Sequence, residues 1–412
     1  MKYAYFLGII LLGLLQLSCS NQESTPQNLP LGIWRGVITQ QGQELPFNFT
    51  LKAGKEATAF EMILHNGTER ILVDEVTRSG DSLFITFNFF DTEIRAGIEN
   101  NTLVGTYNKR YSDEHILGFR ATFNDDKRFV AKNDGNTTDV AGRYQVMFVE
   151  EDGTTYPAVA KLEQEGSRVT GTFLTETGDY RYLEGIADGN DLKLSAFDGT
   201  HLFLFTAKVA GDSLTDGDFW HAKYTHETWS GVKNPEASLS DQYALTYLKE
   251  GYDKMAFSFP NTEGEKVSLT DAKYQDKVVI LQIFGTWCPN CLDETLYYRD
   301  WYNANKDRGA EIIGLAYENK ADFDYASGRV NKMVKKLGVP YEMLIAGTSN
   351  KAEASKTLPM LNHIISFPTS IFLDRKGNVR RIHTGFSGPG TGEDYEKWQQ
   401  SFTELTEELL SE

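Results

Sequence analysis

The hydrophobic and polar positions follow two different patterns along the chain. Between residues 32 and 230, short runs rich in β-branched and aromatic residues are separated by Gly, Asp and Asn, as in residues 80–89 and 198–205. Runs of this kind predict antiparallel β-strands joined by turns. From residue 253, nearly continuous apolar runs alternate with helical patterns, which is typical of an α/β domain. We therefore predict a multidomain chain with an antiparallel all-β region before a C-terminal α/β domain.

The β region is predicted to contain an internal duplication with a repeat of about 110 residues. Similar segments recur in the same order, and the matched pairs are residues 32–36 and 142–146, 45–47 and 156–158, 80–83 and 189–192, and 101–105 and 212–216. We assign β repeat 1 to residues 32–135 and β repeat 2 to residues 136–230. Two such repeats form two small barrels or one large barrel, and chance similarity among β-hairpins is the alternative explanation.

The α/β domain is assigned to residues 253–412, after a linker at residues 231–252 that includes a short helix over 241–250. The expected elements are a strand at 277–284, a helix to 305, a strand at 310–316, a helix at 321–337, a strand at 341–345, a hairpin of strands at 369–373 and 379–384, and a closing helix at 393–410. Alternating strands and helices that end in a hairpin predict a mixed sheet.

Charge and cysteine content narrow the functional classes. The chain has 41 Lys and Arg residues against 58 Asp and Glu residues, a net charge of −17. Nucleic-acid-binding proteins present basic surfaces, so we expect no nucleic-acid partner. Three cysteines are too few for a scaffold built on disulfides. Their positions are more informative than their number.

The first cysteine, Cys19, follows a pattern that resembles a bacterial lipoprotein signal. Lys2 precedes an apolar run at residues 3–15, which is too short to span a bilayer, and Ser18 precedes Cys19. Gln16 departs from this pattern, because an apolar residue is usual there. The resemblance implies a signal peptide at residues 1–19, lipidation of Cys19 and a tether at 20–31. We expect a lipoprotein tethered to a membrane of the cell envelope, facing the periplasm or the cell surface; an ordinary signal cleaved nearby is the alternative.

The other two cysteines form a Cys-x-x-Cys motif, Cys288 and Cys291, directly after a predicted buried strand. Cys288 is expected at the N-cap of the following helix, with Pro289 at the first helical position. The helix N-terminus favours a thiolate at Cys288, and Cys291 lies one turn further on the same face. Inert buried thiols and half of a zinc site are the alternatives. Zinc requires two further ligands, and the closely spaced His221 and His226 lie in the β region.

The wider context of this motif resembles thioredoxin. The motif is preceded by a strand and by Trp287, and the sequence Ser-Phe-Pro-Thr at 366–369 precedes the last hairpin. The segments at 257–261 and 285–287 narrow the resemblance to the TlpA/ResA-like branch of exported thiol–disulfide oxidoreductases. The resemblance covers residues 253–412. A Cys-x-x-Cys motif alone is a weak indication of redox activity, but together with the preceding strand, Trp287 and the downstream proline it is a strong one.

This resemblance assigns roles to residues around the dithiol. Pro368 matches the cis-proline opposite the two cysteines, which leaves the backbone of Phe367 free to pair with an extended substrate. An ordinary trans-proline at a strand entry is the alternative. Trp287 is expected to provide an apolar contact surface for substrate, although simple packing explains it equally well.

A proton acceptor is expected at Glu294. Thioredoxins place a buried Asp six residues before the first cysteine, and Gln282 occupies that position here. Glu294 matches an acid of the ResA-like branch and, by helix spacing, lies on the face of Cys288 and Cys291. We expect burial to raise its pKa. A solvated surface carboxylate beside Asp293 is the alternative.

The sequence thus predicts an exported, lipid-anchored protein-disulfide reductase with catalytic residues Cys288, Cys291 and Glu294. Its expected partners are a disulfide-containing protein substrate and an upstream thiol electron donor, and no cofactor or metal is implied. A peroxidase is one alternative, but the peroxiredoxin motif would place Pro and Thr where Leu281 and Gly285 stand. The other alternative is a ligand-binding or adhesive β domain with an accessory redox domain.

Overall fold

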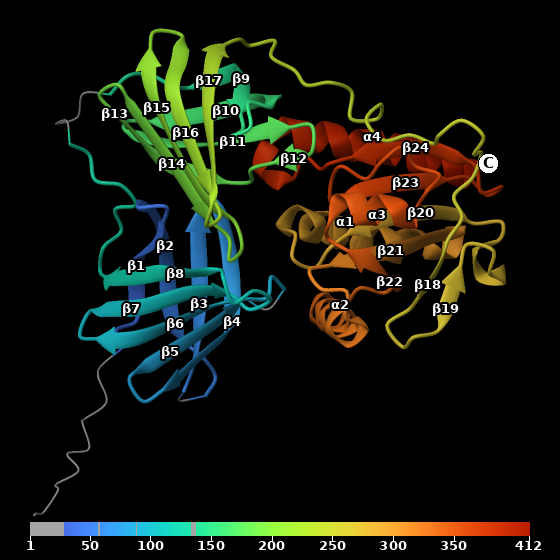
Figure 1. The fold of residues 1–412 in the computed structure, drawn as a ribbon, viewed down its shortest axis with the longest axis horizontal. Coiled ribbons are helices and arrows are strands. Elements are labelled where there is room, and N and C mark those ends of the chain that lie inside the picture. Colours follow the sequence, from blue (N-terminus) through green and yellow to red (C-terminus); the bar gives the residue numbers. More distant parts are fainter. Residues whose placement is uncertain (1–28, 57, 88, 133–136) are drawn as a thin grey trace, which may run out of the picture.

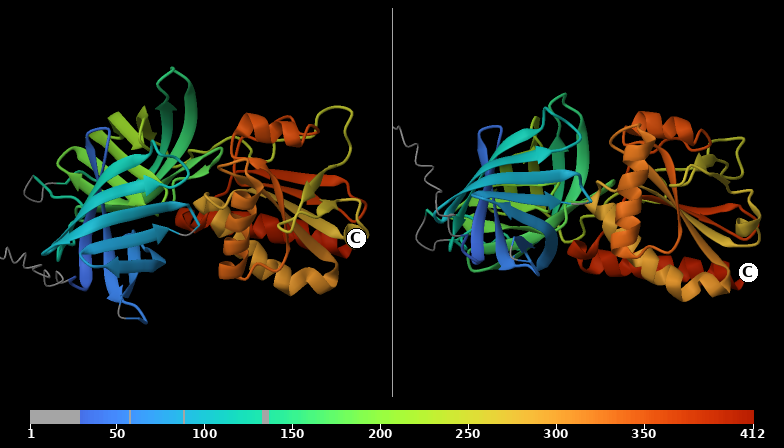
Figure 2. Two further views of the ribbon diagram at one scale, coloured as in Figure 1. Left: turned by 60° about the horizontal axis from the view of Figure 1, so that its bottom comes forward. Right: turned by 90° about the horizontal axis from the view of Figure 1, so that it is seen from below.

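The computed structural model describes residues 29–56, 58–87, 89–132 and 137–412. The predicted signal peptide, including Cys19, and the tether as far as residue 28 lie outside these ranges. The described chain forms two β barrels beside a C-terminal α/β domain, and Figures 1 and 2 show the barrels together on one side of the molecule. The predicted fold class is confirmed, with two barrels rather than one large one.

Barrel 1 is closed and antiparallel, because β1 pairs with β8 and the other strands pair in chain order. Its strands are β1 (Gly32–Gln40), β2 (Gln43–Ala53), β3 (Ala59–Asn66), β4 (Glu69–Ser79), β5 (Ser82–Phe87), β6 (Thr92–Glu99), β7 (Thr102–Lys109) and β8 (Ile116–Phe123). Alternate residues point inward, as the strand period requires. The large rings of Trp34, Phe47 and Phe49 are fully buried in its core.

Barrel 2 has the same arrangement, closed by the pairing of β10 with β11 and of β9 with β17. Its strands are β9 (Gly142–Val149), β10 (Thr155–Glu165), β11 (Arg168–Thr175), β12 (Gly178–Asp179), β13 (Leu183–Asp188), β14 (Asp191–Phe197), β15 (Leu202–Ala210), β16 (Ser213–His221) and β17 (Thr225–Lys233). β17 continues to Lys233, beyond the end expected at residue 230. The short β12 pairs only with the end of β11 and stands outside the eight-strand ring.

The two barrels match strand for strand once β12 is set aside. The predicted equivalence of residues 80–83 and 189–192 places Gly80 between β4 and β5 and Gly189 between β13 and β14. Both glycines have left-handed backbone conformations, with φ of 58° and 62°. The same tight turn therefore occurs at the same place in each barrel.

The C-terminal domain is built on a five-stranded sheet in the order β22-β21-β20-β23-β24, with the first three strands parallel. The strands of this sheet are β20 (Val278–Phe284), β21 (Ala310–Glu318), β22 (Glu342–Thr348), β23 (Thr369–Leu373) and β24 (Val379–Thr384). Before them, β18 (Ser258–Pro260) and β19 (Lys266–Ser268) form a separate two-stranded sheet. The helices of the domain are α1 (Pro289–Asn305), α2 (Phe323–Leu337), α3 (Lys351–Thr357) and α4 (Glu393–Ser411), with short 3₁₀ helices η1 (Ala272–Tyr274), η2 (Lys306–Arg308) and η3 (Pro389–Thr391).

Helices cover both faces of this sheet. On one face α1 packs against α4, where the rings of Tyr298 and Phe402 stack with centroids 5.4 Å apart. The second view of Figure 2 shows α2 on the opposite face. The sheet is therefore buried on both sides, which explains why all seven residues of β20 are buried.

One predicted helix is wrong. Residues 241–250 form an irregular segment rather than a helix. Their backbone groups bond to the C-terminal domain instead: Lys249 N–H donates to the carbonyl of Met360 at 2.8 Å, and Tyr247 N–H donates to Asn362 Oδ1 at 3.0 Å. Tertiary hydrogen bonds have replaced the helical ones. Conversely, the seven-residue α3 was not predicted.

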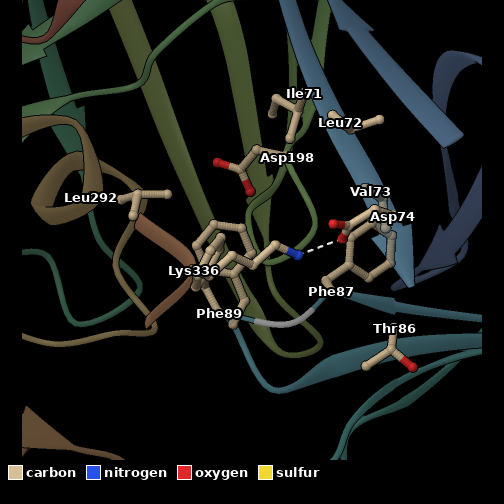
Figure 3. Close-up of a pocket in the computed structure, with 11 residues that line it drawn as sticks. Ile71, Leu72, Val73, Asp74, Thr86, Phe87, Phe89, Asp198, Leu292 and Lys336 are labelled. Atoms are coloured by element: carbon tan, nitrogen blue, oxygen red, sulfur yellow. Dashed lines mark hydrogen bonds and ion pairs between the residues drawn. The ribbon is translucent and has the colours of Figure 1, made fainter. Parts of the chain in front are cut away.

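Barrel 1 contacts the C-terminal domain through α1 and α2. Arg329 of α2 forms an ion pair with the buried Asp91 at 3.3 Å, and Tyr325 donates a hydrogen bond to the same carboxylate at 2.9 Å. Figure 3 shows a small pocket at this interface, with Leu292 of α1 on one side and Phe87 of barrel 1 on the other. These contacts hold barrel 1 beside the helices that follow the cysteine motif.

Candidate active site

The cysteine motif lies at the carboxyl end of β20. This central strand ends at Phe284, and α1 begins at Pro289, so residues 285–288 form the connection between them. Added to Gly285, a Cβ atom would lie 2.2 Å from Trp287 Nε1 and 2.8 Å from the carbonyl oxygen of Tyr317. Glycine at this position therefore lets the Trp287 indole fold back, and its Nε1–H donates to that carbonyl at 2.8 Å.

A buried carboxylate anchors the same connection. Glu318, at the end of β21, accepts hydrogen bonds from the backbone N–H and the hydroxyl of Thr286, both at 2.8 Å. Burial raises the pKa of Glu318. The sequence analysis did not identify this residue. The sequence could have indicated Glu318, because β20 and β21 are adjacent parallel strands and their carboxyl ends meet at one edge of the sheet. A residue at the end of β21 therefore lies near the cysteine motif that follows β20.

Cys288 and Cys291 are joined in a disulfide at the N-terminus of α1. Cys288 is the N-cap residue, Pro289 follows it in the first turn, and the backbone N–H of Cys291 donates to Cys288 Sγ at 3.2 Å. Cys288 is 6% exposed, whereas Cys291 is fully buried. This asymmetry makes Cys288 the sulfur that a substrate can reach, and the helix N-terminus stabilises negative charge on it when it is reduced.

The peptide bond between Phe367 and Pro368 is cis, as expected, and it lies against the disulfide. Cys288 Sγ is 3.4 Å from the carbonyl oxygen of Phe367. The ring of Phe367 makes an edge contact with Trp287, with centroids 5.5 Å apart. The structure thus brings together four residues predicted for this site, and the two rings form an apolar border around Cys288.

Glu294 lies in the interior of the domain, one turn after Cys291, and is fully buried. Its carboxylate accepts hydrogen bonds from Gln282 Nε2 at 2.9 Å, Ser370 Oγ at 2.9 Å and the Tyr298 hydroxyl at 3.2 Å. Burial raises the pKa of Glu294 to about 7, although these three hydrogen bonds act in the opposite direction. A carboxyl group with this pKa exchanges protons near neutral pH.

Gln282 connects this carboxylate to the dithiol. Its side-chain N–H groups donate to Glu294 and, at 3.4 Å, to the carbonyl oxygen of Cys291. Its Oε1 accepts from Thr295 at 3.1 Å and from the Tyr341 hydroxyl at 3.4 Å. Gln282 therefore orients the Glu294 carboxyl group without titrating itself.

Comparisons with known proteins agree with this geometry. Residues 251–382 match the model of the AhpC/TSA family. The chain is 29% identical over 156 residues to the thiol-disulfide oxidoreductase ResA of Bacillus thuringiensis subsp. konkukian, covering 38% of this chain and 80% of that protein. It is 27% identical over 148 residues to ResA of Bacillus subtilis, covering 36% and 74%. The chain is a thiol–disulfide oxidoreductase.

Solved structures similar to this oxidoreductase include two bacterial proteins. A thiol:disulfide interchange protein of the thioredoxin family from Chlorobium tepidum has a TM-score of 0.28 and 22% identity, covering 36% of this chain and 97% of its own. A thiol-disulfide oxidoreductase from Bacteroides fragilis has a TM-score of 0.27 and 17% identity, covering 36% and 99%.

Barrel 2 of the oxidoreductase borders the disulfide, which the sequence analysis did not predict. We call residues 175–181, which include β12, the active-site wall. Asn290, inside the cysteine motif, donates to the carbonyl of Asp179 at 3.1 Å, and Ser366 Oγ donates to the carbonyl of Thr177 at 2.5 Å. The backbone N–H of Gly388 donates to the Asp179 carboxylate at 2.7 Å. The wall is thus bonded to segments on both sides of the disulfide.

A buried arginine joins the wall to both neighbouring domains. Arg181 forms ion pairs with Asp293 of α1, with Glu69 of barrel 1 at 2.6 Å and with Asp198 of barrel 2 at 3.6 Å. Because Arg181 is 8% exposed, its charge requires these partners. Sequence reasoning missed it because a charged residue in a β turn is usually solvent-exposed.

Beside these contacts, a cleft of about 230 Å³ lies between the wall and the thioredoxin-like domain. Cys288 opens into it, together with Trp287 and Phe367 on one side and Tyr180 and Phe203 of barrel 2 on the other. Among the described residues, no group of three or more His, Cys, Asp or Glu side chains is arranged to hold a metal ion.

Proposed function

We propose that this oxidoreductase reduces protein disulfides in the cell envelope. The observation that carries the proposal is the arrangement of Cys288, which opens into the cleft, with a fully buried Cys291 and a buried Glu294 whose pKa is raised to about 7. Resolution of a mixed disulfide requires Cys291 to lose its proton. A buried carboxylate near its neutral-pH midpoint is suited to accept that proton.

The proposed reaction uses the dithiol form. The Cys288 thiolate attacks one sulfur of the substrate disulfide, so that a Cys288–substrate bond forms and the other substrate sulfur leaves as a thiolate. Cys291, deprotonated toward Glu294, then attacks Cys288 Sγ and releases the second substrate thiolate. Two electrons pass to the substrate and the Cys288–Cys291 disulfide forms. An upstream thiol donor reduces it again.

The reduction potential of the Cys288–Cys291 couple tests the direction of electron flow. Equilibration with a thiol–disulfide buffer, followed by alkylation and mass spectrometry, measures it. We expect a value close to that of thioredoxin, about −270 mV, rather than near the about −120 mV of the oxidant DsbA. A value near the oxidant would overturn the assignment as a reductase.

Export and lipid anchoring are part of the same proposal. They rest on the residue 1–19 pattern and on Cys19, which lie outside the described residues. The described helices include none that is long and apolar enough to cross a membrane. Cys19→Ser should remove the protein from the membrane fraction and abolish acyl labelling. Continued partition with membranes would contradict the lipoprotein assignment.

The two alternatives lead to different experiments. A peroxidase should consume hydrogen peroxide at a rate comparable with its disulfide turnover, which we do not expect with Gly285 preceding the motif. If the β region is only a binding module, removing residues 32–230 should leave disulfide turnover unchanged while a cellular phenotype is lost. Because barrel 2 contacts Asn290 and Ser366 beside the disulfide, we expect removal of the β region to change disulfide turnover as well.

A further inference from the structure

The active-site wall occupies the surface beside Cys288 that a large partner would need. Thr177 lies so close to the C-terminal domain that a Cβ atom added to Gly385 would be 2.9 Å from its carbonyl carbon. A Cβ atom added to Gly178 would lie 3.0 Å from Asn290 Nδ2. These two close approaches flank the disulfide, so the wall and the domain are in direct van der Waals contact there.

Ion pairs away from the disulfide hold the wall in place. Lys161 of barrel 2 bonds to Asp394 at the start of α4, at 2.8 Å, and to the carbonyl of Thr391 at 2.7 Å. The pair between Arg329 and Asp91 ties barrel 1 to α2 at 3.3 Å. Together with Arg181, these pairs fix both barrels against the thioredoxin-like domain.

The space that remains at Cys288 is small. A stable complex with a folded protein buries roughly 800 Å² on each partner, which requires a broad surface around the reacting sulfur. The cleft of about 230 Å³ is instead below the volume range of pockets that hold drug-sized molecules, which begins at roughly 300 Å³. It is lined by Thr177, Tyr180, Phe203, Trp287 and Phe367 around Cys288. Its aromatic border suits a narrow, partly apolar chain.

We propose that this cleft is the substrate site and that the active-site wall restricts it to slender disulfides, namely those of small molecules or of extended peptide segments. A disulfide on the surface of a folded protein is excluded because its carrier collides with barrel 2. This inference rests on the proposed function, since it names the class of disulfide that the dithiol reduces. The redox step itself is unchanged.

Matched carriers test the restriction in the wild-type, full-length protein. The two carriers are a short peptide and a folded protein that contain the same cysteine with the same flanking residues. In each carrier this cysteine forms a mixed disulfide with glutathione. Oxidised glutathione itself is the small-molecule probe. We expect kcat/KM for the peptide to exceed that for the folded protein by about 10²-fold or more. Turnover of the peptide would support both the inference and the proposed function, whereas turnover of oxidised glutathione alone would restrict the site to small molecules and overturn protein disulfides as the substrate. Equal turnover of both carriers would overturn the inference, whereas failure to reduce any probe would overturn the proposed function instead.

Two variants alter access in opposite directions. Thr177→Trp adds a large ring to the wall and should lower kcat/KM for the peptide by about 10-fold, chiefly through KM. Its matched control is Thr154→Trp, at an exposed turn of the same barrel. Arg329→Ala removes the ion pair between α2 and barrel 1 and should raise turnover of the folded carrier by about 10-fold without lowering that of the peptide. Its control is Lys356→Ala, which removes an exposed pair within α3.

The outcomes separate restriction from a merely structural role. If Thr177→Trp and Thr154→Trp both leave the peptide KM unchanged, the cleft is not the substrate site. If Arg329→Ala leaves the ratio between the two carriers unchanged, the docked barrels do not limit access. Far-ultraviolet circular dichroism of each variant shows that the fold is retained, so that a lost rate reports on the cleft.

Discussion

The two barrels share a strand order, yet only one of them borders the redox site. In barrel 1, residues 67 and 68 connect β3 directly to β4. In barrel 2, the equivalent connection between β11 and β13 spans residues 176–182 and includes β12. These added residues contribute most of the active-site wall. A longer turn therefore makes one copy of the duplicated barrel part of the cleft at Cys288, while the order of the eight strands in the ring is the same in both barrels.

Barrel 1 meets the thioredoxin-like domain by different contacts. Its Asp91 binds Arg329 and Tyr325, and its apolar residues border Leu292 in the pocket of Figure 3. The residues that line the cleft come from barrel 2 and the thioredoxin-like domain. Barrel 1 thus supports the arrangement, whereas barrel 2 shapes what reaches Cys288.

The largest expected effect comes from Cys291→Ser, which should abolish multiple turnover. Without the resolving thiol, a substrate peptide remains bound to Cys288 as a mixed disulfide. Hydrogen exchange of the trapped complex should show new protection at the active-site wall in barrel 2 and none at the equivalent turn, residues 67 and 68, in barrel 1. Equal protection of both turns would contradict the difference between the barrels. Cys288→Ser, which traps nothing, is the control.

The next effect concerns two buried arginines, Arg181 at the wall and Arg128 between the barrels. Arg128 donates to the carbonyl of Ser195 at 3.0 Å and lies 3.7 Å from Glu184. Replacing Arg181 by Met leaves buried carboxylates without their cation and should lower the free energy of unfolding by about 3–5 kcal/mol. Replacing Arg128 by Met should lower it by about 1–3 kcal/mol, because buried carbonyl oxygens lose their donor while Glu184 keeps its ion pair with Arg168. Urea unfolding measures both losses.

Only one of these variants, Arg181→Met, should change the pH dependence of Cys288 alkylation. Arg181→Met leaves Asp293 without its ion pair beside α1, and this extra negative charge opposes a thiolate at Cys288. The pH at which Cys288 is half alkylated should therefore rise in Arg181→Met and stay unchanged in Arg128→Met. Matching profiles in both variants would show that the wall is electrostatically independent of the redox site.

The third effect distinguishes proton transfer by Glu294 from the entry of substrate into the cleft. Glu294 bonds only to groups of the thioredoxin-like domain in its three hydrogen bonds, from Gln282, Ser370 and Tyr298. Glu294→Gln should slow resolution of the mixed disulfide by about 10²-fold, because the proton acceptor is lost. Stopped-flow measurement of leaving-thiol release should show the slower resolution in Glu294→Gln alone and in the double variant with Thr177→Trp. In the double variant, the fold-changes of the two single variants should multiply. Glu404→Gln, on the exposed face of α4, is the control.

The same substitution has a signature in stability. Because the folded state raises the pKa of Glu294 from 4.5 to about 7, it favours the protonated carboxyl group. The associated stability is complete below pH 4.5 and is lost as the pH rises through about 7, by about 3 kcal/mol in total. Glu294→Gln should remove this decline from the pH dependence of unfolding. An unchanged profile would show that Glu294 does not titrate in this range.

The thioredoxin-like half was predictable because its signals are local. A continuous apolar run gives β20, Pro289 after Cys288 marks the start of α1, and Pro368 lies in a motif of fixed spacing. The burial of Glu294 followed from helix spacing and from the glutamine at position 282. These features need only a few neighbouring residues, and the structure reproduces each of them.

The remaining features depend on distant contacts, which the sequence does not display. Residues 241–250 have a helical composition, but their backbone bonds to Met360 and Asn362 on another segment. Arg181 lies in a turn, where charged residues are usually solvated, and its burial depends on Glu69 and Asp293 from two other domains. The wall was therefore missed because contacts with two other domains hold it in place.

The smallest expected effect tests how closely the two barrels remain equivalent. Gly32 starts β1 with φ of 130°, and Gly142 starts β9 with φ of 138°. A Cβ atom on Gly32 would lie 3.3 Å from the ring of Phe123, the last residue of β8, and one on Gly142 would lie 2.7 Å from Cε of Lys233, the last residue of β17. The same close approach therefore occurs at the same junction in both barrels.

Replacing each glycine by alanine should destabilise its own barrel by about 1–2 kcal/mol, because both positions need a backbone conformation that side chains disfavour. The loss should be larger for Gly32→Ala. The Phe123 ring packs against Trp34, with centroids 5.4 Å apart, whereas the Lys233 side chain can swing away. Hydrogen exchange of peptides from each barrel measures the two losses separately. Gly328→Ala is the control, since a Cβ atom there meets nothing within 4 Å and the position is helical, so it should be neutral or stabilising. A reversed order, with Gly142→Ala the more damaging, would show that the barrels have diverged at this junction as well as at the wall.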